Sequence, residues 1–173
     1  MKFVTTKLWN DDVRSGNTRE ALKKSLENLG LDYVDLYLIH WPAEGYVEAY
    51  LEMEKLQKEG LTRSIGVSNF RKSHLQNLLS KVHIVPSINQ IETNPQMVDE
   101  ETIQYCKENK IGVEAWSPLG SGACLNNPKI QEIANKYQKS SAQIILRWLF
   151  KKVLLYYLNQ FMKIELKENN RSL

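Results

Sequence analysis

A lysine and a histidine stand where two apolar segments of the chain end, and both side chains can take part in acid–base chemistry. Lys7 lies near the end of segment 2–8, and His40 follows the apolar run VDLYLI. Such runs predict buried parallel strands, and the carboxyl ends of successive parallel strands meet at one edge. We therefore expect Lys7 and His40 to share a catalytic site. Taken singly, Lys7 could equally be a solvated strand end and His40 a core histidine.

The elements that must position these two residues follow a regular alternation. Strands are predicted at 2–8, 33–40, 64–68, 86–92 and 112–116, and helices at 18–30, 47–59, 73–80, 99–109, 130–137 and 140–149. Alternation of this kind with short connectors predicts βα units and a parallel sheet. The segment 121–128 is predicted to be a loop, and it is long enough to have a function.

Composition excludes several classes of function. The 173 residues, 42% hydrophobic and 25% charged, suffice for one domain with a sizeable core. A net charge of +3 without a basic patch argues against a nucleic-acid partner. Cys106 and Cys124 lack metal-ligand spacing, so we expect reduced thiols and no metal. The chain has no membrane-length apolar stretch and no leader pattern at its start, which favours a cytoplasmic protein without a membrane partner.

Five ordered motifs resemble those of the aldo-keto reductases. They are Thr5–Trp9, Leu29–Pro42, Ile65–Phe70, Asn89–Glu92 and Ala115–Gly120. Members of that family are eight-stranded barrels that reduce carbonyl compounds with NADPH. The resemblance implies a partial (β/α)8 TIM barrel carrying family strands three to seven. It also implies an NADPH-dependent reductase whose partner is a small-molecule aldehyde or ketone.

The resemblance assigns roles to the residues at the predicted strand ends. Lys7 and His40 match the Lys and His of a catalytic tetrad in which a Tyr gives the proton and an Asp pairs with the Lys. Ser68, Asn69 and Gln90 match positions that bind the nicotinamide carboxamide. The alternative for Ser68 and Asn69 is ordinary turn chemistry.

Further cofactor and substrate contacts are implied on the same basis. Trp116 stands where the family places an aromatic residue on the nicotinamide ring, although core burial would also explain it. Ser117, Leu119 and Gly120 follow in a loop suited to contacts with the pyrophosphate. Trp9 and Trp41 match the aromatic walls of the substrate pocket, with packing at the barrel rim as the alternative.

The chain departs from the family pattern at both ends. We expect the strand with the catalytic Asp and the loop with the Tyr to precede residue 2, so both groups are absent from this sequence. After Phe150, residues 151–173 replace the Pro-Lys-Ser and Arg-Ile segments that hold the 2′-phosphate of NADPH. A shift of one base near Lys152 would restore both segments. We therefore predict a barrel domain at 1–150 and a frameshifted tail at 151–173, with a helix slightly favoured over residues 151–166.

These departures leave more than one function open. The first hypothesis is an NADPH-dependent carbonyl reductase whose activity is impaired in this chain. The second is a non-catalytic remnant that binds nucleotide or acts as an interaction module, and the third is a pseudogene product. A partial sheet has unpaired edges, so we also expect self-association through them.

Overall fold

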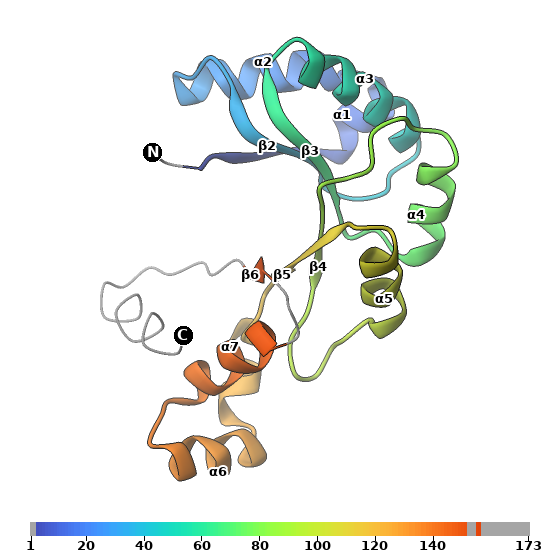
Figure 1. The fold of residues 1–173 in the computed structure, drawn as a ribbon. Helices are drawn as coiled ribbons and strands as arrows, with labels where there is room; N and C mark the ends of the chain where they lie inside the picture. Colours follow the sequence, from blue (N-terminus) through green and yellow to red (C-terminus); the bar gives the residue numbers. More distant parts are fainter. Residues whose placement is uncertain (1–2, 152–154, 157–173) are drawn as a thin grey trace. The chain divides into compact units, whose positions relative to one another are not determined.

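The structure is a computed structural model that describes residues 3–151 and 155–156. Strands and helices alternate along the chain (Figure 1). The strands are β1 (Thr5–Leu8), β2 (Val34–Ile39), β3 (Thr62–Ser68), β4 (Ile88–Glu92), β5 (Gly112–Trp116) and β6 (Leu155–Tyr156). The helices are α1 (Asn10–Ser15), α2 (Thr18–Leu29), α3 (Tyr46–Lys58), α4 (Lys72–Leu79), α5 (Glu100–Glu108), the 3₁₀ helix η1 (Gly120–Asn126), α6 (Pro128–Tyr137) and α7 (Ser141–Lys151).

The strands follow one another in the sheet in chain order, β1-β2-β3-β4-β5-β6. Neighbouring strands run parallel, as in β1 with β2 and β3 with β4. A parallel pair needs a crossover connection, and helices provide it along this chain. The predicted partial TIM barrel of parallel strands and alternating helices is therefore confirmed.

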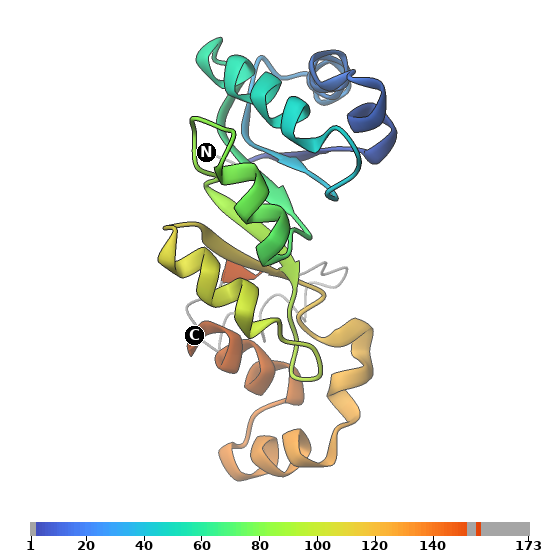
Figure 2. The ribbon, with the colours of Figure 1, turned by 90° about the vertical axis from the view of Figure 1, so that its right-hand side faces the viewer.

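Two compact units make up the chain. The first comprises Met1–Gln90 with Glu101–Ile111, and the second comprises Ile91–Glu100 with Gly112–Leu173. In the first unit, α1, α2 and α3 lie together on one side of β1, β2 and β3 (Figures 1 and 2). The first unit thus contains β1, β2, β3 and the beginning of β4 with the helices that cover them.

The core of the first unit is centred on β2, which is buried at all six of its positions. A strand covered on both faces has a continuous apolar sequence, as VDLYLI nearly does. Side chains from both neighbouring strands and the covering helices complete this core. They include Leu8, Ile65 and Val67 from the strands and Leu22, Tyr50, Met53, Leu56, Leu75 and Leu78 from the helices.

Gly66 lets β4 approach β3 closely. A Cβ atom at this position would lie 2.7 Å from the backbone oxygen of Ile88 and 2.9 Å from Cδ2 of Leu38. Leu38 and Ile88 belong to one buried apolar cluster together with Leu36. The bare backbone of Gly66 therefore sets the spacing at which Ser68 pairs with Gln90 two residues further on.

The structure differs from the predicted local structure at several places. No helix was predicted at α1, and residues 121–126 of the predicted loop belong to η1. Helix α6 begins at Pro128, two residues earlier than predicted, after Asn127 accepts the Lys129 N–H at 3.0 Å. The helix slightly favoured over residues 151–166 is wrong at Leu155 and Tyr156, which pair with β5 as a strand. The rest of that segment beyond Lys151 lies outside the described residues.

No helix within the described part of the chain combines the length and the apolar character that crossing a membrane requires.

Replacing Gly66 by alanine should destabilise the protein by about 1–3 kcal/mol, because the added methyl group overpacks the contact with Ile88. The free energy of unfolding in urea measures this effect. Ser64→Ala in the same strand adds no atom and should change that free energy by less than about 0.5 kcal/mol. Equal stability of the Gly66→Ala variant and the parent chain would contradict the close approach of β4.

Candidate functional site

Lys7 and His40 lie at the carboxyl ends of adjacent strands. Lys7 pairs with Leu38, and Leu8 pairs with Ile39, in the register of β1 and β2. The ladder continues by one step, because the backbone N–H of His40 donates to the carbonyl oxygen of Leu8 at 3.1 Å. Both side chains are half-buried. The structure therefore brings together the two residues that we expected to share a site.

Two exposed tryptophans stand beside the imidazole. The ring centroids of Trp9 and His40 are 4.8 Å apart at 61°, an edge-on contact, and those of His40 and Trp41 are 6.3 Å apart. Trp9 keeps 53% and Trp41 keeps 43% of its surface exposed. Large exposed aromatic surfaces next to a polar group are suited to contact a small ligand.

Ser68, Asn69 and Gln90 form a hydrogen-bonded group at the ends of β3 and β4. The Ser68 hydroxyl and the Asn69 backbone N–H both donate to the Gln90 carbonyl oxygen, at 2.9 and 2.8 Å. The Asn69 amide donates to the Ser68 hydroxyl at 3.1 Å and to the His40 carbonyl oxygen at 2.9 Å. Asn69 has a φ of 62°, a left-handed conformation that asparagine tolerates better than most residues. This residue therefore ties the end of β3 to the end of β2.

A side-chain hydrogen bond also connects the end of β1 to the end of β4. The Lys7 ammonium donates to Oε1 of Gln90 at 2.6 Å, across three strand pairs. Gln90 is 4% exposed. The first unit thus holds Lys7, His40, Ser68, Asn69 and Gln90 in one connected group, with Trp9 and Trp41 at its side.

The electrostatic environment favours a neutral His40. Burial lowers the pKa of the imidazole below its ordinary value of 6.5, and the positive charge of Lys7 lowers it further. A neutral imidazole has one N–H donor and one acceptor nitrogen, so it can donate a hydrogen bond to a substrate oxygen without carrying charge.

Asp35 and Tyr37 lie on β2 but have structural roles. The Asp35 carboxylate accepts the Val4 N–H at 2.9 Å and pairs with Arg63 at 3.2 Å. Tyr37 is fully buried, its hydroxyl donates to the Thr18 carbonyl oxygen at 3.3 Å, and burial raises its pKa. A buried phenol with a raised pKa is a poor proton donor to a substrate at the strand ends. Both side chains therefore serve the packing around β2.

The remaining predicted site residues belong to the second unit. Trp116 ends β5, and its carbonyl oxygen accepts the Thr93 N–H at 3.3 Å. Ser117 then has a φ of 50°, and its carbonyl oxygen accepts the Gly120 N–H at 2.9 Å, a tight turn that also contains Leu119. A Cβ atom at Gly120 would lie 2.8 Å from the Cys124 sulfur. The predicted site residues are therefore divided between the two units.

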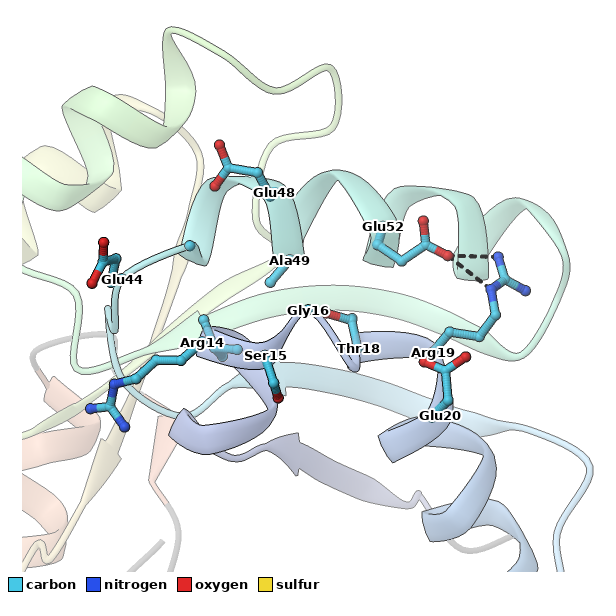
Figure 3. A pocket seen from close by; sticks show the side chains of 12 residues that line it. Arg14, Ser15, Gly16, Thr18, Arg19, Glu20, Glu44, Glu48, Ala49 and Glu52 are labelled. Atoms are coloured by element: carbon cyan, nitrogen blue, oxygen red, sulfur yellow. Dashed lines mark hydrogen bonds and ion pairs between the residues drawn. The ribbon is translucent and has the colours of Figure 1, made fainter.

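A cleft of about 730 Å³ in the first unit was not anticipated from the sequence. It lies between α1, α2 and α3, and none of the predicted site residues lines it (Figure 3). Its carboxylates at Glu44, Glu48 and Glu52 point in different directions, and Glu52 pairs with Arg19 at 2.8 Å. Among the described residues, no group of three or more His, Cys, Asp or Glu side chains is placed to hold a metal ion.

The family model of the aldo/keto reductase family matches residues 2–172. Glyoxal reductase of Bacillus subtilis is 49% identical over 147 residues, covering 84% of this chain and 53% of that protein. Methylglyoxal reductase DkgA of Escherichia coli is 48% identical over 151 residues, covering 84% of this chain and 54% of that protein. A solved structure of Bombyx mori aldo-keto reductase in complex with NADP has a TM-score of 0.88 at 40% identity, covering 96% of this chain and 61% of that one.

The chain therefore belongs to the aldo/keto reductase family, and the resemblance inferred from the five motifs is confirmed. It spans about half the length of the curated relatives that it matches.

The pKa of His40, measured by NMR titration of its ring protons, should lie below 6.5 and should rise when Lys7 is replaced by methionine. Because the pKa of His40 is lower in the folded state than in the unfolded state, protonation favours the unfolded chain. The free energy of unfolding should therefore be highest above pH 6.5 and should decrease as the pH falls below it. His74 is an internal control, because burial and Arg71, not Lys7, lower its pKa. An unchanged His40 pKa in Lys7→Met would contradict the proximity of the two charges.

Proposed function

We propose that the strand-end site of the first unit serves in the NADPH-dependent reduction of aldehydes or ketones to alcohols. The observation that carries this proposal is the connected group of Lys7, His40 and Gln90 at the ends of three parallel strands. Membership in the aldo/keto reductase family supports it.

Lys7 and His40 have complementary roles in this proposal. The neutral His40 imidazole donates a hydrogen bond to the carbonyl oxygen and polarises the C=O bond. The Lys7 ammonium stabilises the negative charge that develops on that oxygen when hydride reaches the carbonyl carbon. NADPH supplies the hydride when bound, and a proton on the oxygen completes the alcohol.

The donor set of Ser68, Asn69 and Gln90 fits the carboxamide of a nicotinamide ring. A hydroxyl and two primary amides offer both donors and acceptors, which a carboxamide needs. Hydrogen bonds to backbone, to one another and, for the Gln90 side chain, to Lys7 hold the three residues, so their orientation is set before a ligand arrives. In the second unit, Trp116, Ser117, Leu119 and Gly120 are proposed to contact the ring and the pyrophosphate.

Small aldehydes, glyoxal and methylglyoxal among them, are the proposed substrates. Two relatives are named for these compounds, and they are 49% and 48% identical to this chain over 147 and 151 aligned residues. Trp9 and Trp41 offer exposed aromatic surface on which a compact substrate can pack beside His40. Only Ala43 to Gly45 separate Pro42 from the start of α3, and we propose that so short a loop leaves this side of the substrate site open.

Residues 1–173 by themselves are proposed to turn over carbonyl compounds very slowly. The family takes the proton from a Tyr that an Asp–Lys pair assists, and the matched motifs here supply the Lys and the His alone. The second candidate function, nucleotide binding without turnover, is favoured for this chain because the carboxamide-binding residues lie together in the first unit. Titration of NADPH fluorescence should show weak binding.

The activity is tested with a chimera. The segment that precedes the matched part of the Bacillus subtilis glyoxal reductase is fused before residue 2, and NADPH consumption is followed with methylglyoxal. We expect near-background turnover for residues 1–173 and clear turnover for the chimera. Lys7→Met and His40→Ala in the chimera should each lower kcat/KM by about a hundredfold or more, since both groups act on the carbonyl oxygen.

Lys24→Met, an exposed position on α2, is the matched control and should leave turnover unchanged. A folded chimera without activity would overturn the reductase proposal. Full activity in either site variant would overturn the role assigned to that residue.

A further inference from the structure

The backbone of Asn69 has an uncommon conformation that the chain must stabilise. Its φ of 62° lies in the left-handed region, where the Cβ atom is crowded by the backbone. The chain turns at this residue from β3 toward α4, and the Asn69 amide donates to the Ser68 hydroxyl and to the His40 carbonyl oxygen. In the proposed function this amide also binds the nicotinamide carboxamide, so the geometry of the site depends on the turn.

Asn89 binds the backbone of the next residue, Phe70, at two points. Nδ2 of Asn89 donates to the Phe70 carbonyl oxygen at 2.8 Å, and Oδ1 of Asn89 accepts the Phe70 N–H in a longer bond of 3.4 Å. Both residues are 0% exposed. Phe70 lies beyond the end of β3, so the Asn89 amide supplies the acceptor and the donor that a neighbouring strand supplies elsewhere in a sheet.

Asn89 acts from the face of the sheet opposite to the candidate site. Successive side chains of a strand point to opposite faces. The Gln90 side chain reaches Lys7 at the strand ends, whereas Nδ2 of Asn89 lies 3.8 Å from the Cys106 sulfur on α5. Asn89 therefore lies on the helix side of β4, and it can influence a ligand at the strand ends only through the turn.

We propose that Asn89 is a positioning residue of the nicotinamide site, whose amide holds the Phe70 backbone and thereby fixes the left-handed turn at Asn69. This inference rests on the proposed function. The Phe70 N–H belongs to the peptide group that follows Asn69, so its bond to Oδ1 sets the orientation of that peptide plane. The Phe70 ring is anchored separately, because it packs edge-on against Tyr46 with the ring centroids 5.1 Å apart.

The effect on the turn is tested without cofactor. A positive φ brings the amide proton and the Hα of a residue close together, so Asn69 should give a strong intraresidue nuclear Overhauser effect in the parent chain. We expect it to fall severalfold in Asn89→Leu, which has a similar shape without hydrogen-bonding groups. Gln138, which has a φ of 52° at the end of α6, is the internal reference and should keep its signal. An unchanged Asn69 signal in the folded variant overturns the proposal.

Two controls keep this test decisive. Asn89→Ala adds no bulk and repeats the measurement if Asn89→Leu does not fold. Leu22→Ala, which removes a 0% exposed side chain from α2, lowers stability through a cavity and should leave the Asn69 signal strong. In the parent chain itself, one Nδ2 proton of Asn89 should exchange slowly with solvent, and rapid exchange of both protons contradicts the proposal whatever the variants do.

The effect on the site is tested by the affinity for the nicotinamide part of the cofactor. NADPH binding by residues 1–173 should weaken about tenfold in Asn89→Ala, the loss expected for one misplaced hydrogen bond. The affinity for 2′-phosphoadenosine diphosphoribose, which lacks nicotinamide, should not change. Leu22→Ala should alter neither affinity.

The outcomes separate this inference from the proposed function. An unchanged NADPH affinity in Asn89→Ala, or equal weakening of both ligands, overturns the positioning role while leaving cofactor binding intact. Failure of the parent chain to bind NADPH overturns the proposed nucleotide site, and the measurement on Asn69 still decides whether Asn89 fixes the turn.

Discussion

The parallel, in-register pairing of β1 to β4 is the constraint on which the candidate site depends. Leu8 pairs with Ile39 and Ser68 pairs with Gln90, so each strand delivers its last side chains to the same edge. A slip of one residue would turn every side chain of a strand to the opposite face and would remove Lys7 from Gln90. Gly66 supports this register, because only a residue without a Cβ atom allows Ile88 to come so close to β3.

This edge of the sheet concentrates polar groups in partly buried surroundings. The hydrogen bonds between these groups reduce the free-energy cost of removing them from water. The Gln90 carbonyl oxygen accepts two hydrogen bonds from the end of β3, and its side-chain oxygen accepts one from Lys7. A buried network is rigid when each of its polar groups has a hydrogen-bond partner. The same partial burial disfavours a second positive charge, which keeps the His40 imidazole neutral beside the Lys7 ammonium. A neutral donor next to a fixed cation is suited to a carbonyl oxygen that gains negative charge.

The sequence predicted the strands well because short apolar segments of five to eight residues between amphipathic helices favour buried strands. It also predicted that Lys7 and His40 would lie at neighbouring strand ends. It missed α1, a six-residue helix with little apolar pattern that ends at the left-handed Gly16, and η1, whose course depends on positive φ angles at Ser121 and Gly122. The Asn127-Pro128 pair was a usable signal for the start of α6. The Lys7–Gln90 bond joins residues 83 positions apart, so it depends on the register of three strand pairs that no local pattern encodes.

The most direct test of the strand-end site is an NMR titration of residues 1–173 with NADP⁺ that follows the ring protons of His40 and the side-chain amides of Asn69 and Gln90. If these strand ends form the nicotinamide site, those signals shift together and saturate, while backbone amides of Arg14 to Thr18 in the cleft of Figure 3 stay in place. Shifts confined to the cleft, or no saturable change at His40, Asn69 and Gln90, would contradict the account.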